Sequence, residues 1–515
     1  MSRRFPQFGS IVVVAALFVS VTMPAAWAQR RSSLVSQAEA QRFGLQRMWF
    51  TRIQFDPARG RIVDMRQHVS SKYGYTVYEI TSERGRSVIT DRDLDRLGDP
   101  LGKEGAEKQA NKLLQQLTRS GIKAEMKTQV FPEISIYVTS DTGVVQAIDG
   151  ETGRTKWSTM VGNPRYPVEA PGANDDYVGV VNGSSIYVLD QATGNIAWRR
   201  QAKGSPGAGP VLTDTLLYVP MINGRMEGYD LGDYRQPPWV YQAHGRSMIQ
   251  PTVGSTTVAW PTDAGHLYVA GANQAQILYR LETQRPIVAP ATALPPNRLL
   301  VVSTDGYVYC IHENSGGLQW QFSTGEPIVQ PAVVVEDAIY AVTGENNLFR
   351  LSGKDGQDAW WTPRIRKVLT ASKNRLYCVG DTGRIVIFDA KTGGRLGSLS
   401  TETVDLTMVN HQTDRIFLAS RAGIVQCLRE VQAEWPVIHS GGLEDKKKPE
   451  KGAAAGAKPK PAAAPAAAPP PAAADPFGGG GGGADPFGGG SSSSDSGGSE
   501  APADPFGSGG SDPFK

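Results

Sequence analysis

The side chains that could perform chemistry are few in this chain, and they show no ligand spacing. Metals such as zinc need histidine or cysteine ligands at short, regular intervals. The six histidines are instead scattered, at His68, His244, His266, His312, His411 and His439. Three cysteines, Cys310, Cys378 and Cys427, are also far apart and favour buried free thiols, with a Cys378–Cys427 disulfide as the alternative. The sequence contains no Gly-x-Ser-x-Gly motif and no phosphate-binding glycine loop.

Four aspartates recur at one place in a repeated pattern. Asp149-Gly-Glu-Thr-Gly153 and Asp190-Gln-Ala-Thr-Gly194 are the clearest copies, and Asp230 and Asp389 end equivalent apolar runs. A carboxylate in this position can accept hydrogen bonds from the backbone N–H groups of a tight turn, and the closing glycine can adopt the left-handed conformation. We therefore interpret these aspartates as turn residues and not as catalytic bases.

The elements that must position these side chains repeat about every 40 residues from Tyr137 onward. Each copy has an aromatic-led apolar run, a glycine, a second apolar run, a turn and a tryptophan. Short β-branched and aromatic runs predict antiparallel strands, and this period is typical of β-propeller blades. We expect each tryptophan to lie on the outermost strand and to pack on the next blade. The repeat positions are Gly143, Asp149, Gly153, Trp157, Gly183, Asp190, Gly194, Trp198, Gly224, Asp230, Trp239, Gly306, Trp320, Trp360, Gly383, Asp389 and Gly393.

Eight copies can be counted, and the last is incomplete. Residues 417–428 are followed by no Asp, no Thr-Gly turn and no repeat tryptophan. Because an unfinished blade would leave a bare sheet edge, we expect residues 47–53, with Trp49, to supply the missing outer strand. Residues 61–65 would then open the first blade. The predicted fold is all-β: an eight-bladed propeller of four-stranded antiparallel blades, closed by an N-terminal strand, over residues 29–440.

The repeat is interrupted at about residues 73–129. Residues 75–80 and 86–90 predict a hairpin. Residues 103–118 carry apolar side chains at helical spacing and predict an amphipathic helix that Gly121 ends. We interpret this segment as a small α/β insertion in the first blade, projecting from one rim. It is either a site of specific contact or a structural cover for the rim.

The N-terminus predicts export. Arg3 and Arg4 precede an apolar run over residues 11–21, and Ala26-Trp27-Ala28 offers a cleavage site, so we expect a signal peptide over residues 1–28. The twin arginines leave a twin-arginine route open beside the ordinary one. We expect a protein of the periplasm or cell envelope, with no transmembrane segment in the mature chain. The net charge of +3 gives no electrostatic argument for nucleic acid.

The C-terminal part, residues 441–515, is rich in Ala, Pro, Gly and Ser, a composition that predicts a disordered tail. An Asp-Pro-Phe tripeptide nevertheless recurs there four times. Its phenylalanines are candidate anchors for a partner's pocket, and several copies on one tail would add avidity. A low-complexity repeat without a ligand is the alternative. The four anchors are Phe477, Phe487, Phe506 and Phe514.

The repeat over roughly residues 130–430 resembles the pyrroloquinoline-quinone (PQQ)-like propeller repeat. Quinoprotein dehydrogenases and the BamB-like subunit of the outer-membrane β-barrel assembly machinery share it. The resemblance implies an architecture and not a chemistry. Quinoprotein dehydrogenases of this fold use adjacent cysteines, a Ca²⁺ ion and an Asp base, and many carry a haem at Cys-x-x-Cys-His; this chain has no adjacent cysteines and no such haem motif. The signal peptide, propeller and tail together also resemble envelope proteins of the planctomycete type.

The BamB-like resemblance implies a partner chain bound through loops on one face of the ring. We therefore expect a non-enzymatic envelope scaffold that needs no cofactor and binds other envelope proteins through propeller loops and the Asp-Pro-Phe tail. A dehydrogenase dependent on PQQ and Ca²⁺ is the alternative, and adaptor binding through the Asp-Pro-Phe motifs is another. The chain departs from the BamB pattern in two ways: it has no lipid-attachment cysteine after the cleavage site, and it has the tail.

Overall fold

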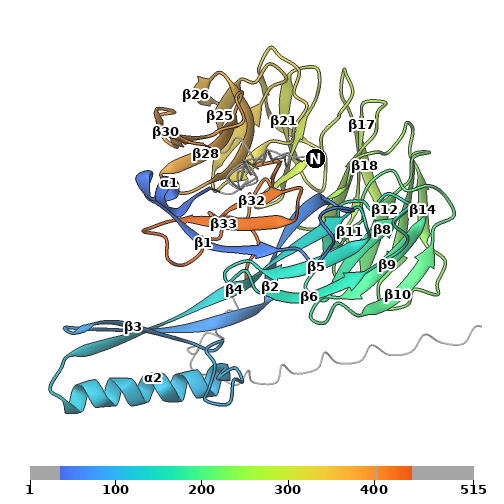
Figure 1. Ribbon diagram of the computed structural model, residues 1–515. Helices are drawn as coiled ribbons and strands as arrows, with labels where there is room; N and C mark the ends of the chain where they lie inside the picture. The colour runs from blue at the N-terminus through green and yellow to red at the C-terminus, as the bar shows by residue number, and fades with distance from the viewer. Residues whose placement is uncertain (1–34, 401–403, 444–515) are drawn as a thin grey trace, which may run out of the picture. The chain divides into compact units, whose positions relative to one another are not determined.

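The structure is a computed structural model that describes residues 35–400 and 404–443. These residues belong to one compact unit, and they form eight antiparallel sheets and two helices (Figure 1). The predicted signal peptide and the tail phenylalanines Phe477, Phe487, Phe506 and Phe514 lie outside the described residues.

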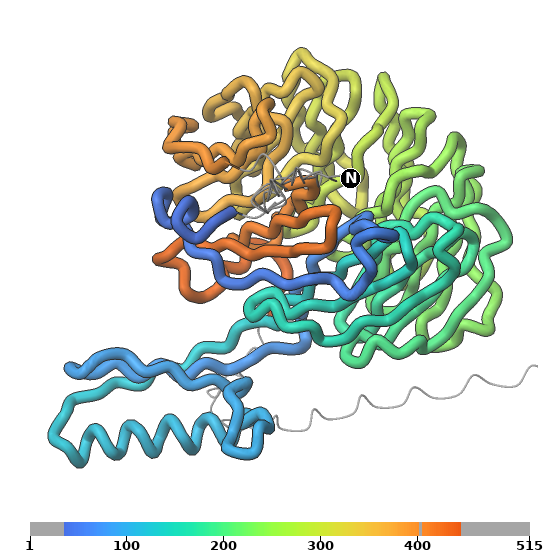
Figure 2. Tube along the Cα trace, viewed as in Figure 1, coloured from blue at the N-terminus to red at the C-terminus, as the bar shows by residue number. Residues whose placement is uncertain are grey.

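The sheets follow one another along the chain, and each is one blade of a propeller (Figure 2). Blade 1 has β2 (Ile62–Ser82), β4 (Ala124–Ser140), β5 (Val144–Asp149) and β6 (Thr155–Met160), with β3 (Gly85–Thr90) added at its edge. Blade 2 has β7 (Gly172–Ala173), β8 (Tyr177–Asn182), β9 (Ser185–Asp190) and β10 (Ile196–Gln201). Blade 3 has β11 (Val211–Leu212), β12 (Leu216–Pro220), β13 (Arg225–Asp230) and β14 (Trp239–Gln242). Blade 4 has β15 (Thr252–Val253), β16 (Thr257–Pro261), β17 (His266–Gly271) and β18 (Ile277–Glu282).

The remaining blades repeat the same order from the innermost strand to the outermost. Blade 5 has β19 (Thr292–Leu294), β20 (Arg298–Val302), β21 (Tyr307–His312) and β22 (Leu318–Ser323). Blade 6 has β23 (Val333–Val335), β24 (Ala338–Val342), β25 (Leu348–Ser352) and β26 (Asp358–Thr362). Blade 7 has β27 (Ile365–Ala371), β28 (Arg375–Gly380), β29 (Ile385–Asp389) and β30 (Arg395–Leu399). Blade 8 has β31 (Leu406–Thr407), β32 (Ile416–Ser420), β33 (Ile424–Glu430) and β1 (Leu45–Arg52).

Blade 8 closes the ring by joining the two ends of the propeller, as the sequence predicts. Strand β1 pairs antiparallel with β33, and Trp49 lies opposite Cys427. Upstream of the helix α1 (Gln37–Arg42), the backbone of Val35 exchanges two hydrogen bonds with the Gln426 side chain, at 3.1 and 3.0 Å. The prediction of an all-β, eight-bladed propeller closed by an N-terminal strand is confirmed over the described residues.

Most of the repeat tryptophans lie between blades and pack against the backbone of the next blade, namely Trp49, Trp157, Trp320 and Trp360. A Cβ atom added to Gly194 would lie 2.4 Å from the Trp157 ring, and one added to Gly393 would lie 2.7 Å from Trp360. Trp49 against Gly153, Tyr279 against Gly316 and Trp320 against Gly356 repeat the contact. The indole N–H of Trp157 also donates to the Gln191 carbonyl oxygen at 2.8 Å. Only glycine leaves room for an indole at these turns.

The repeat aspartates shape the turns on which these tryptophans pack. The Asp149 carboxylate accepts the Thr152 N–H at 2.8 Å and the Thr152 hydroxyl at 2.9 Å. Asp190 and Asp389 accept the same pair of bonds from the threonine three residues later. Gly153, Gly194 and Gly393 then adopt φ angles of 72–73°, a left-handed conformation that glycine adopts without strain.

Blades without a Thr-Gly turn fill the same space differently. Blade 3 has Asp230-Leu-Gly-Asp-Tyr234, and Trp198 stacks on the Tyr234 ring at 5.6 Å between centroids. Trp239 lies in an apolar cluster with Ala275, a non-glycine residue at a φ of 49°. Blade 7 has the Thr-Gly turn but no tryptophan on its outer strand. Gly397 stands at the equivalent position, and the Phe43 ring fills the space beside it.

The predicted insertion is an extension of two strands of blade 1. Strands β2 and β4 run past the blade and pair with each other to their far ends, where Ser82 lies opposite Ala124. Strand β3 pairs with the far half of β2, and the helix α2 (Gly102–Arg119) packs on one face of the three strands. We call residues 75–130 the arm; it projects from the blades in Figure 1.

Gly194→Ala should destabilise the protein by about 2–4 kcal/mol, because it combines a strained left-handed alanine with a clash against Trp157. Gly325→Ala is the matched control: its φ of 75° is similar, but an added Cβ meets no atom within 4 Å. We expect the control to cost only about 1–2 kcal/mol. Chemical denaturation of both variants measures the difference, and equal midpoints would show that the indole contact adds nothing.

Candidate functional site

The blades have two faces, which the strand register distinguishes. One face carries the turns that join the second and third strands of each blade, and Gly143, Gly183, Gly224, Gly306 and Gly383 adopt positive φ angles there. The Asp149–Gly153 turn and its equivalents lie at the opposite end of the strands. The arm extends from this second end, because β2 and β4 continue past Val69 and Ile134. We call the two sides the turn face and the arm face.

Three exposed apolar side chains lie at equivalent positions on the turn face, one in each loop that enters blades 4, 5 and 6. Met248 is 56% exposed, Val288 is 42% exposed and Val329 is 45% exposed. These blades are consecutive, and their innermost strands β15, β19 and β23 contact one another in that order. We call Met248, Val288 and Val329 the apolar arc.

The loops of the arc are fixed by a buried neighbouring residue and by hydrogen bonds to their own blades. The residue before each exposed side chain is buried: Ser247, Ile287 and Ile328 are all at most 1% exposed. Each loop also bonds to a turn of its own blade. The Gly344 N–H donates to the Pro327 carbonyl oxygen at 2.7 Å, and the Ser303 hydroxyl donates to the Arg285 carbonyl oxygen at 3.0 Å. A preorganised apolar surface costs little conformational entropy when a partner covers it.

The segment of β2 that leads into the arm, residues 68–72, is anchored to blade 2 through two aspartates in the turn between β7 and β8. Asp175 lies 3.0 Å from His68 Nε2, and the Ser71 hydroxyl donates to it at 2.6 Å. Burial by itself raises the pKa of Asp175, but hydrogen bonds from His68, Ser70 and Ser71 outweigh it and hold this pKa well below its usual range. Asp176 pairs with Lys72 at 2.7 Å.

The arm is anchored to blade 1 by Arg92. Its guanidinium lies 4.2 Å from the centre of the Tyr75 ring, and its Nη1 donates to Asp149 Oδ2 at 2.8 Å. Asp149 therefore has a second role beyond its turn, because it is the repeat aspartate that also binds the arm. Glu133, which lies in β4 where the arm joins blade 1, is 3.8 Å from Arg92 and also pairs with Lys156.

Residues 431–443, which follow the last strand, brace the base of the arm; we call them the closing segment. The Trp435 ring stacks on Phe131 of β4 at 5.2 Å between centroids. Glu434 pairs with Arg86 of β3, and Leu443 packs against Gly74 of β2. The sequence prediction assigned Trp435 to no element. The closing segment was therefore missed.

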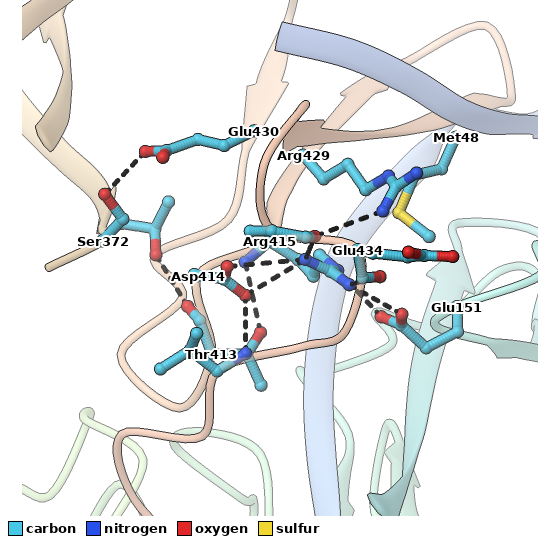
Figure 3. Close-up of polar contacts among 12 residues, drawn as sticks. Met48, Glu151, Ser372, Thr413, Asp414, Arg415, Arg429, Glu430 and Glu434 are labelled. Carbon is cyan, nitrogen blue, oxygen red and sulfur yellow. Dashed lines mark hydrogen bonds and ion pairs between the residues drawn. The ribbon is translucent and has the colours of Figure 1, made fainter. Parts of the chain in front are cut away.

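A buried arginine holds the closing segment to the ring (Figure 3). Arg415 donates from Nε and Nη2 to the two carboxylate oxygens of Glu151, at 3.0 and 2.9 Å. Its remaining N–H groups reach Asp414 and the carbonyl oxygens of Ala433 and Glu434, at 3.0–3.4 Å. The Arg415 side chain is 0% exposed. One guanidinium thus joins blade 8, a turn of blade 1 and the closing segment.

The predicted repeat residues come together in pairs between blades and not in one pocket. Their aspartates are hydrogen-bonded in turns, and their tryptophans lie in the apolar layers between sheets. The arc and the closing segment were not predicted. An Asp-Arg pair directly before an apolar strand, as at Asp414-Arg415, is the sequence signal that could have indicated the buried ion pair.

The described residues contain no group of three or more His, Cys, Asp or Glu side chains placed to hold a metal ion. Cys310, Cys378 and Cys427 are all buried and free. Burial raises the pKa of each thiol, which lowers its reactivity. The repeat aspartates accept turn N–H groups in four different blades, so they do not converge on one Ca²⁺ ion. Over the same part of the chain, neither helix is long and apolar enough to cross a membrane.

Arg415→Met should destabilise the protein by about 3–5 kcal/mol at pH 7, because it leaves the carboxylates of Glu151 and Asp414 buried without their counter-charge. Burial already raises the pKa of Asp414, and the substitution removes the opposing effect of Arg415. A folded-state pKa raised above the unfolded value costs stability as pH rises, so the deficit of the variant should shrink from pH 7 to pH 5. Denaturation midpoints at both pH values measure it.

The matched control is Arg42→Ala, which removes one partner of an exposed ion pair with Glu39 at 3.4 Å. We expect this change to stay within about 0.5 kcal/mol. An Arg415→Met variant as stable as the control would contradict the role given to the buried guanidinium.

Comparisons with known proteins find similarity to outer membrane protein assembly factors and to a quinohemoprotein dehydrogenase. Outer membrane protein assembly factor BamB of Moranella endobia is 21% identical over 290 residues, covering 51% of this chain and 74% of that protein. BamB of Yersinia pestis is 22% identical over 325 residues, covering 56% and 81%. Quinohemoprotein alcohol dehydrogenase ADH-IIG of Pseudomonas putida is 25% identical over 228 residues, covering 40% of this chain and 28% of that enzyme. The crystal structure of BamB from Moraxella catarrhalis has a TM-score of 0.48 at 16% identity, covering 57% of this chain and 91% of that chain.

A family profile described as outer membrane protein assembly factor BamB matches residues 114–286 and 263–420. These matches begin in the arm and end with β32 in blade 8, and together they span more than half of the chain. The resemblance drawn from the repeat is confirmed. The chain belongs to the family of outer membrane protein assembly factor BamB.

Proposed function

We propose that this protein is a non-enzymatic scaffold of the cell envelope, exported by its N-terminal signal, which binds other envelope proteins through the turn face of its propeller. Several relatives are named as outer membrane protein assembly factors, and this chain would serve the assembly or organisation of envelope proteins in a similar way. The proposal includes no cofactor.

The observation that carries the proposal is the apolar arc. Solvent-exposed methionine and valine side chains gain free energy when a partner covers them. A single exposed apolar residue needs no explanation, but three at one structural position in consecutive blades form a row along one face. Charged residues Arg246, Arg285 and Glu326 precede the three exposed positions by two or three residues and supply a polar border. An apolar centre with a polar border is the usual anatomy of a protein interface.

Met248→Asp, Val288→Asp and Val329→Asp, combined in one variant, should reduce capture of envelope partners at least tenfold. Each carboxylate would have to be desolvated where the partner now covers an apolar group. The measurement is a pull-down of envelope extract with the purified mature chain, followed by quantitative mass spectrometry.

The matched control carries Leu278→Asp, Leu318→Asp and Leu396→Asp, three exposed leucines on the outermost strands of blades 4, 5 and 7. We expect this control to keep the partners of the unaltered chain. If both variants captured the same proteins as the unaltered chain, the arc would not be the binding surface. A gain of dye-reducing activity after reconstitution with PQQ and Ca²⁺ would contradict the non-enzymatic part of the proposal.

We propose that the Asp-Pro-Phe tail supplies a second, multivalent contact. Replacing Phe477, Phe487, Phe506 and Phe514 together by Ala should remove the tail-dependent partners while leaving those of the arc, because the phenylalanines are the only large apolar side chains that follow Leu443 in the sequence. The same pull-down, with a chain ending at Leu443 as reference so that the closing segment is kept, measures the effect. Identical partner sets for the full chain, the quadruple variant and the shortened chain would exclude a role for the motifs.

A further inference from the structure

The arm has an open strand edge. Strand β4 pairs with β2 along its whole length, but on its other side it pairs with β5 only from Ser135 onward. Within the described residues, no hydrogen bond joins the backbone of Ala124–Val130 to any strand other than β2. Along these seven residues of extended backbone, every second residue directs its N–H and C=O groups away from β2, and these groups have no strand partner in the described part of the chain. Such an edge is a template for another strand.

The other edge of the arm, formed by β3, is blunted. The Thr90 N–H and hydroxyl donate to the Asp93 carboxylate, at 2.9 and 2.8 Å, so the end of β3 is occupied by its own turn. Arg86 near its start is engaged by Glu79 and by Glu434 of the closing segment. Among residues 35–400 and 404–443, none protects the edge of β4 in this way. Glu125, Lys127 and Thr128 are exposed, and Val130 is 52% exposed.

The sequence of this edge is complementary to itself. When two copies of one strand pair antiparallel about a two-fold axis, one residue lies directly opposite its own copy, and the axis passes midway between the two. The residue before it in one copy then lies opposite the residue after it in the other copy. An axis at Glu125 would oppose two glutamates, and an axis at Lys127 would oppose two lysines. An axis at Met126 opposes Glu125 of each copy to Lys127 of the other, twice. Opposite charges directly across a strand pair stabilise it, and like charges destabilise it.

With the axis at Met126, the other opposed residues of the two strands are also compatible with a dimer. Met126 would face Met126, and Ala124 would face Thr128, so no charge is buried against an apolar group. Glu125 and Lys127 alternate with Met126, which packs against α2. The two charges therefore lie on the face of the sheet away from α2, and both helices would lie together on the other face.

We propose that a second copy of this chain docks on the open edge of β4, so that two arms join into one six-stranded antiparallel sheet with Glu125 paired to Lys127 across the two-fold axis. The arms hold the two propellers together, and the turn face of each, on the opposite end of its blades, stays accessible. Pairing of the arms does not depend on whether the apolar arc binds a partner.

The test is the oligomeric state of the purified mature chain, measured by sedimentation over a range of concentrations. We expect a concentration-dependent dimer. Glu125→Lys alone and Lys127→Glu alone should each weaken the dimer at least tenfold, because each change opposes like charges twice. The double variant E125K/K127E should restore it. An equimolar mixture of the two single variants should form a heterodimer, since one copy then carries both positive charges and the other both negative charges.

A disulfide test fixes the register. Because the native cysteines are buried, Glu125→Cys and Lys127→Cys provide the reactive thiols. Under mild oxidation, a mixture of these two variants should cross-link into dimers more efficiently than either variant alone. Thermal unfolding of every variant checks that the exposed changes leave the fold intact. A monomer at all concentrations, or a dimer that neither charge change weakens, would overturn the proposal.

Discussion

The packing of an indole ring against a backbone with no side chain is the interaction on which the ring depends. Each blade has apolar side chains on both of its faces and cannot bury them alone. The left-handed glycine of one blade brings its backbone close enough for the tryptophan of the preceding blade to cover it, as Gly194 does for Trp157. Trp49 extends the same contact from blade 8 to Gly153 of blade 1. Where it occurs, the contact holds neighbouring blades close together, and at Trp49 it closes the ring.

The ends of the blades are adapted to two different tasks. On the turn face, short loops expose apolar side chains. Hydrogen bonds to their own blades fix the conformation of these loops. On the arm face, the repeat is modified: Asp149 also binds Arg92, and Glu151 of the same turn binds the buried Arg415. A turn that elsewhere only joins two strands here connects the arm, the first blade and the closing segment. Rigid support of the arm follows from these shared contacts.

Much of the fold could be predicted from the sequence because the repeat encodes local geometry. Asp149, Gly153 and Trp157 each have a physical requirement that few other residues meet, and together they define strand, turn and inter-blade contact. The pairing of residues 47–53 with the last blade could be predicted because the incomplete eighth copy would otherwise leave an unpaired sheet edge. Contacts between dissimilar segments could not be predicted in this way. Arg415 meets Glu151 across 264 residues. Glu151 occupies a variable position of the repeated turn, where the next copy has Ala192, and Arg415 lies outside the repeated pattern. The arc was missed for a different reason: a valine in a short apolar run, such as Val329 after Ile328, gives no sign of which of the two is exposed.

Closure through β1 and β33 also has a consequence for the order of folding. Val35 and Gln426, which bond to each other, are 391 residues apart, so the first strand cannot find its place until nearly the whole propeller has been made. Contacts between such distant residues form slowly because a long loop must be closed first. While the chain emerges, blades 1 to 7 can stack in sequence, and the early strand waits with an uncovered edge. We therefore expect the pairing of β1 with β33 to be the slow step in folding. A chaperone that binds the unpaired β1 strand would act before this step.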